Sequence, residues 1–171
     1  FQGIEPLLIS GTAMADLTIN SHKKPGHSRQ LVASKRVGSA KGKIVLAAHM
    51  DSKYDTPGAL DNAAGIAVLL EAAAAIDVAE YDVDIVPFNS EEYYGASGEM
   101  AYLGRIDGEQ IVLMINIDSP CHVGSQTAVS FYNFSDDMQA AADKVIASSP
   151  DIVKGDAWYA GDHAPFLFRG I

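Results

Sequence analysis

The chain has 171 residues, which is enough for one domain with a core of its own. Hydrophobic residues make up 48% and charged residues 20%, as in a globular protein, and no apolar run reaches the roughly 20 residues that a membrane span requires. The formal net charge of −10 argues against nucleic-acid binding, which needs a basic face, and the single cysteine excludes an internal disulfide and a cysteine-rich zinc site.

The first half of the chain predicts strands followed by a long helix. Residues 17–20 and 30–37 are typical of short strands, and the apolar run at residues 44–48 predicts a buried central strand. Residues 62–76 predict a helix that is apolar nearly all round and therefore mostly buried. A further strand is predicted over residues 82–89, although Pro87 is unusual in a central strand because it lacks a backbone N–H.

The second half continues the alternation of strands and helices. A helix is predicted near residues 95–104, strands over 110–118 and 128–134, and a short helix within 162–170. The longest helix of this half begins at Ser135 as the N-cap and stops at Pro150. This order predicts an α/β fold of three layers, α/β/α, with a central mostly parallel or mixed sheet.

Acidic and imidazole side chains follow three of the predicted strands. His49 and Asp51 follow the first buried strand, Glu91 and Glu92 the next, and Asp118 the third. In sheets of this class, ligands bind at the carboxyl ends of the strands. We therefore expect these side chains to share one edge of the sheet.

Each of these residues, taken alone, has a simpler structural explanation. A single histidine is more often packed or capping, an aspartate before a helix is often an N-cap, and two adjacent glutamates can form a solvated turn. Together, the candidates supply two imidazoles and three carboxylates, a set that suits two zinc ions sharing one carboxylate, with cobalt or manganese as substitutes. The five candidate ligands are His49, Asp61, Glu92, Asp118 and His163.

Five sequence blocks then carry a resemblance to a known family. In chain order they are AAHMDS, GALDNAAGIAVLLEAA, NSEEYYGASGE, INIDSP and GDHAPF. They resemble the successive motifs of the two-zinc aminopeptidase family, which includes bacterial leucyl aminopeptidase, aminopeptidase Y, glutamate carboxypeptidase and glutaminyl cyclase. The resemblance covers residues 49–170, and it implies the zinc-exopeptidase fold.

The resemblance also implies a role for each site residue. His49 and Asp118 are expected to bind one metal ion and Glu92 and His163 the other, with Asp61 bridging the two. Asp51 lies two residues after His49, and residues i and i+2 of an extended chain point the same way, so its carboxylate is expected to hold the second nitrogen of the imidazole. The resemblance likewise implies that Asp51 orients His49, and it further implies that Glu91 is the general base and that a cis peptide bond joins Asp61 to Asn62.

The expected activity is zinc-dependent removal of the N-terminal residue from peptide substrates with a free N-terminus. The alternatives are a di-zinc dipeptidase, deacylase or carboxypeptidase of the same fold, glutaminyl cyclase chemistry on one zinc ion, or a catalytically silent binding domain. The spacing of 12 residues between His49 and Asp61 and the DNAAG helix start favour the aminopeptidase.

The ends of the chain suggest a piece of a longer protein. The chain starts without Met, and it stops at Ile171, where family members continue into a further strand. We expect one zinc-peptidase catalytic domain over residues 1–171, excised from a longer chain and truncated at the C-terminus, with self-association through the truncated edge. The family resemblance favours a secreted or cell-envelope location, with the cytoplasm as the alternative.

Overall fold

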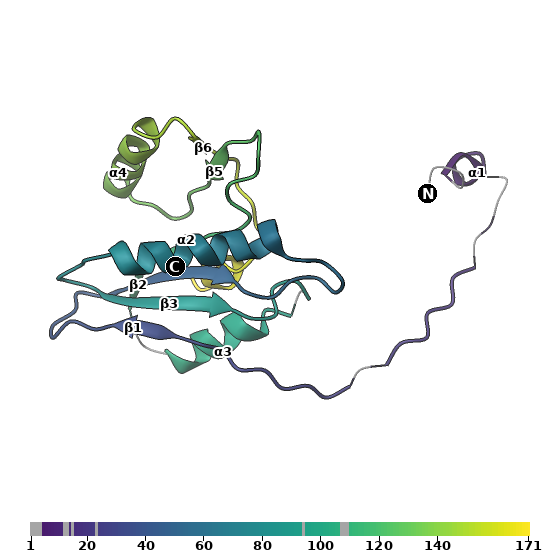
Figure 1. Cartoon of the computed structure of the whole chain (residues 1–171), viewed down its shortest axis with the longest axis horizontal. Helices are drawn as coiled ribbons and strands as arrows, with labels where there is room; N and C mark the ends of the chain where they lie inside the picture. The colour runs from purple at the N-terminus through teal and green to yellow at the C-terminus, as the bar shows by residue number, and fades with distance from the viewer. Residues whose placement is uncertain (1–4, 12–13, 15, 23, 94, 107–109) are drawn as a thin grey trace.

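The computed structural model of the chain describes residues 5–11, 14, 16–22, 24–93, 95–106 and 110–171. Its helices and strands alternate as predicted over most of the chain (Figure 1). The elements are α1 (Glu5–Ile9), β1 (Ala33–Lys35), β2 (Lys43–His49), the wide turn η1 (Ala59–Ala64), α2 (Gly65–Ala75), β3 (Asp82–Phe88), α3 (Ser97–Arg105), β4 (Ile111–Asn116), β5 (Thr127–Val129), α4 (Asp136–Ala147), β6 (Ile152–Lys154) and α5 (Ala164–Leu167).

The main sheet is mixed, as the sequence predicts. Its order is β1-β3-β2-β4; β2 is parallel to both β3 and β4, and β1 is antiparallel to β3. The parallel strands therefore end at the same edge. The prediction of strands at residues 17–20 and over the whole of 30–37 is wrong, because only Ala33–Lys35 pairs with the sheet and residues 17–20 form no strand.

Helices cover both faces of the sheet, and each face has its own apolar core. On one face, α2 packs through Leu69 against Leu46 and Ile85. On the opposite face, Tyr102 of α3 and Phe166 of α5 pack on Phe88, with ring centroids about 6 Å apart. This arrangement confirms the predicted layers of helix, sheet and helix.

The prediction that the long helix is mostly buried is wrong. The outer side of α2 is exposed: the relative solvent-accessible surface is 61% for Leu70 and 39% for Val68. The prediction failed because the helix is rich in alanine. Alanine is small and favours the helical backbone, so it occurs on both the buried and the exposed face of a helix. The packed side of α2 contains Ile66, Leu69, Ala72 and Ala73, and this stripe is enough to cover the sheet.

Local contacts explain how β3 accommodates two residues that are unusual in a buried strand, Pro87 and Asp84. Pro87 lies beyond the end of β1, so the missing N–H interrupts no ladder on that side, and Gln30 instead donates to the Pro87 carbonyl at 2.8 Å. Asp84 is buried, but it accepts from Ser34 and Tyr102 and lies 2.9 Å from the Lys43 ammonium. Although burial opposes ionisation, these donors hold the pKa of Asp84 below its usual range.

A smaller unit of β5, α4 and β6 follows β4. β5 and β6 form a separate parallel pair. Ser135 is the N-cap of α4, as predicted, and its side chain accepts from the backbone N–H of Met138. In Figure 1 this unit is drawn above α2 and the sheet, whereas α1 lies apart from the sheet. None of the helices in the described part of the chain combines the length and apolar character that a membrane span requires.

Candidate metal centre

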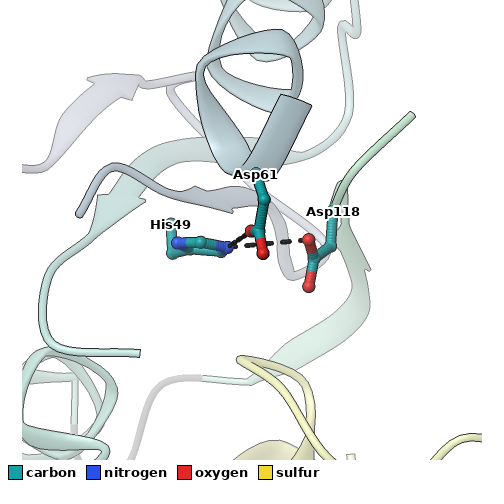
Figure 2. Close-up of side chains that lie close together, drawn as sticks. All are labelled: His49, Asp61 and Asp118. Atoms are coloured by element: carbon teal, nitrogen blue, oxygen red, sulfur yellow. Dashed lines mark ion pairs between the residues drawn. The ribbon is translucent and has the colours of Figure 1, made fainter. Parts of the chain in front are cut away.

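Three predicted site residues converge at the carboxyl edge of the sheet. His49 is the last residue of β2, Asp118 follows β4, and Asp61 lies in η1 at the foot of α2 (Figure 2). His49 Nε2 lies 2.9 Å from Asp61 Oδ1 and 3.6 Å from Asp118 Oδ1. Among the described residues, these three form the group whose ligand atoms all lie close enough to hold one metal ion.

Asn62 explains why Asp61 and Asp118 lie side by side. Its buried side chain donates to the Ile117 carbonyl at 2.9 Å, and its Oδ1 accepts from the Ser119 N–H at 3.0 Å and the Gly65 N–H at 3.1 Å. One amide therefore ties the start of α2 to the loop after β4, with a ligand on each side. The peptide bond between Asp61 and Asn62 is cis, as the family resemblance implied.

The imidazole of His49 is the most constrained ligand of the three. It is 1% exposed, and within the described residues its Nε2 has no partner in hydrogen-bonding geometry, although two carboxylates face it. When the imidazole is protonated, these carboxylates form ion pairs with it, but neither contact has the geometry of a hydrogen bond. A metal cation bound between His49 Nε2 and the two carboxylates would satisfy all three groups.

The electrostatics of the three residues favour a positive charge between them. Burial opposes protonation of His49, but Asp118, Asp162 and Glu91 together raise the pKa of His49 to about 10. Contact with His49 lowers the pKa of Asp118, against the effect of burial. Asp61 is nearer to the imidazole than Asp118, but its side chain is more exposed. Solvent therefore screens the charge of Asp61 more strongly and weakens its effect on His49.

Asp51 supports the site in a different way from the one predicted. His49 Nδ1 lies 3.0 Å from the backbone carbonyl of Asp51, and the carboxylate that we expected to hold the imidazole is farther away, at 3.7 Å. That carboxylate instead accepts from the backbone N–H groups of Glu91 and Glu92, at 3.2 and 3.3 Å. Asp51 therefore ties the loop after β2 to the turn that carries both glutamates.

The two adjacent glutamates have different environments. Glu91 is half-buried, and burial together with Asp118, Glu92 and Asp61 raises its pKa, although His49 opposes the rise. Glu92 is buried, and its Oε2 lies 3.1 Å from the ammonium of Lys53. The sequence gives no signal for Lys53, which lies in a polar loop.

His163 does not join the group of three in the structure. Its Nε2 lies 2.6 Å from the carbonyl oxygen of Trp158, and its ring stacks on Tyr132 at 5.1 Å between centroids. The preceding Asp162 is buried, and burial together with Glu99 raises the pKa of Asp162 to about 9. Neither partner of His163 could be found from the spacing of the motifs, because both contacts depend on the β5–β6 unit.

The family model for peptidase family M28 matches residues 31–171. The chain belongs to peptidase family M28. Members of this family are zinc-dependent.

Individual relatives agree with this family. The probable lipoprotein aminopeptidase LpqL of Mycobacterium tuberculosis is 29% identical over 96 residues, which are 53% of this chain and 19% of LpqL. The crystal structure of the Legionella pneumophila aminopeptidase LapA has a TM-score of 0.68 and 19% identity, over 83% of this chain and 42% of LapA. Glutaminyl cyclase of Macrostomum lignano has a TM-score of 0.57 and 23% identity, over 83% of this chain and 58% of the cyclase. The chain thus spans less than half the length of LpqL and LapA.

Proposed function

We propose that this chain forms the core of a zinc-dependent aminopeptidase that hydrolyses the N-terminal peptide bond of peptides. The observation that carries this proposal is the buried Nε2 of His49, which faces Asp61 and Asp118 without a hydrogen bond among the described residues. The reaction is supported by the family, and the aminopeptidase specificity by the names of the relatives LpqL and LapA.

The donor set fits zinc, which binds imidazole nitrogen and carboxylate oxygen. His49 and Asp118 would hold one ion, Glu92 and His163 would hold a second, and Asp61 would be shared. The second ion is part of the proposal. To bind it, Glu92 and His163 would exchange their present contacts with Lys53 and with the Trp158 carbonyl for contacts with the metal. Zinc bound there supplies a Lewis acid that polarises a carbonyl oxygen and acidifies water.

Glu91 is the proposed general base. Burial and neighbouring carboxylates raise its pKa, so its carboxylate is a stronger base than that of an ordinary glutamate. Glu91 would take a proton from the attacking water and later transfer it to the nitrogen of the leaving amine. Asp51 holds the backbone N–H of Glu91 and thereby fixes the turn on which the base lies.

The acidic character of the chain suits a substrate with a free amino terminus. Asp61, Glu91, Glu92 and Asp118 gather carboxylates at one edge of the sheet, and the whole chain carries a net charge of −10. Two bound zinc ions would offset the charges of these carboxylates, but the net charge of the chain would stay negative, and such a field attracts a cationic N-terminal ammonium and repels a substrate carboxylate. This argument favours an aminopeptidase over a carboxypeptidase.

Replacing Glu91 by Gln tests the assignment of the base. We expect Glu91→Gln to keep its zinc and to lose roughly 10²–10⁴-fold in turnover of an aminoacyl amide, the usual scale for general-base catalysis. Glu92→Gln should instead release part of the zinc. Zinc content by atomic absorption and initial rates on free and N-acetylated peptides give the readouts. Zinc loss in Glu91→Gln with zinc retention in Glu92→Gln would reverse our assignment, and cleavage of only the acetylated peptide would favour a deacylase.

A further inference from the structure

Glu92 is a buried carboxylate that already has a cation. Its side chain is 7% exposed, and the Lys53 ammonium lies 3.1 Å from its Oε2. The lysine comes from the loop between β2 and η1, and its side chain is 55% exposed. The contact therefore joins a buried anion to a cation whose side chain remains largely in water.

This pair makes the two halves of the predicted metal centre unequal. In the half formed by His49, Asp61 and Asp118, the buried Nε2 has no hydrogen-bond partner among the described residues. In the other half, Glu92 holds the ammonium of Lys53. A metal ion that takes Oε2 of Glu92 as a ligand must therefore displace this ammonium.

We propose that Lys53 is a built-in counter-cation of Glu92 that competes with the second metal ion for this carboxylate. This inference rests on the proposed function, because it assumes that Glu92 is a metal ligand. Lys53 thereby keeps the turn of Glu92 folded when the metal is absent, and it lowers the affinity of the second position for zinc.

The physical basis is the cost of a buried charge without a partner. A desolvated carboxylate requires a counter-charge, and removal of one partner leaves the other strongly destabilised. Lysine suits an exchangeable partner because its ammonium is a compact charge on a flexible stem and is strongly hydrated when released. A divalent ion replaces it with a larger charge, so exchange is favourable when zinc is abundant.

The test compares zinc binding by the full chain with Lys53 changed and unchanged. Lys53→Met removes the competing charge, and Lys53→Gln removes the charge while keeping a polar end. Lys41→Met is the matched control, because Lys41 pairs with Glu80 at an exposed site. Each protein is stripped with a chelator and titrated with zinc in a calorimeter, and thermal unfolding is followed with and without zinc.

We expect Lys53→Met to bind the second zinc ion roughly 10- to 100-fold more tightly than the unchanged chain, the scale of one charge-assisted contact. The first ion should bind equally in all proteins, and Lys41→Met should match the unchanged chain. The metal-free Lys53→Met protein should unfold at a lower temperature, and zinc should restore it. If Lys53→Met fails to fold without metal, Lys53→Gln must still bind the second zinc ion more tightly than the unchanged chain does, although by a smaller factor.

Equal or weaker binding of the second ion in both Lys53 variants would overturn the competition while leaving the proposed function intact. Failure of every protein, the unchanged chain included, to bind a first ion would instead overturn the proposed function, and this inference with it. The first-ion affinity thus separates the two failures.

Discussion

At the scale of single residues, the sequence predicted the convergence of three candidate ligands better than it predicted their contacts. His49, Asp61 and Asp118 lie together as expected. The spacing of His49 and Asp51 suggested a contact between carboxylate and imidazole, but the imidazole lies closer to the backbone carbonyl of Asp51. β2 ends at His49, so Asp51 lies outside the strand, and the rule that residues i and i+2 of a strand point the same way does not apply to it.

This difference leads to a prediction for Asp51. Both oxygens of its carboxylate accept backbone N–H groups, so Asp51→Asn would place an amide NH₂ against one of these donors. We expect zinc affinity to fall about 10- to 100-fold, as losses in the support of metal ligands do. Asp55→Asn is the control, because Asp55 is exposed in the same loop and its positive φ of 63° suits asparagine. Equal zinc affinity of the two variants would show that Asp51 does not support the site.

At the scale of elements, one tightly packed junction positions two ligands. Gly65 opens α2 where no side chain fits, because a Cβ there would lie 2.1 Å from Asn62 Oδ1 and 2.7 Å from the Ile117 carbonyl oxygen. The glycine thus lets α2 approach the loop after β4. The sequence block DNAAG marked this helix start, but the close approach became visible only when β4 and its loop were placed beside it.

We therefore predict opposite effects for two glycine substitutions. Gly65→Ala should destabilise the fold by about 1–3 kcal/mol through overpacking and should also weaken zinc binding, because Asn62 must move. Gly104→Ala, in the exposed part of α3 with open space around it, should stabilise by about 0.5–1 kcal/mol through helix propensity. Urea unfolding of both variants measures the free energies. A Gly65→Ala protein as stable as Gly104→Ala, with unchanged zinc affinity, would contradict the packing argument.

At the scale of the whole molecule, periodicity predicted the layers and the edge that carries the site. The apolar runs of β2 and β3 and the alternation with helices were sufficient for that. The exposed side of α2 was predicted wrongly, because alanine occurs on both buried and exposed sides of helices and so does not indicate which side is buried. The partners of Glu92 and His163 could not be predicted either, because Lys53 and Trp158 lie in loops without periodicity.

The central claim is that His49, Asp61 and Asp118 hold a metal ion, and zinc titration of the chelator-treated chain tests it most directly. Neighbouring carboxylates raise the pKa of His49 to about 10, so near neutral pH a proton occupies the imidazole of the metal-free protein and zinc must displace it. We expect the first zinc ion to release about one proton, its apparent affinity to rise with pH up to about 10, and His49→Ala to lose this binding. Calorimetry in two buffers of different ionisation enthalpy gives both the affinity and the proton count. Zinc binding of equal strength in the unchanged chain and in His49→Ala, or no zinc binding by the unchanged chain, would contradict the claim.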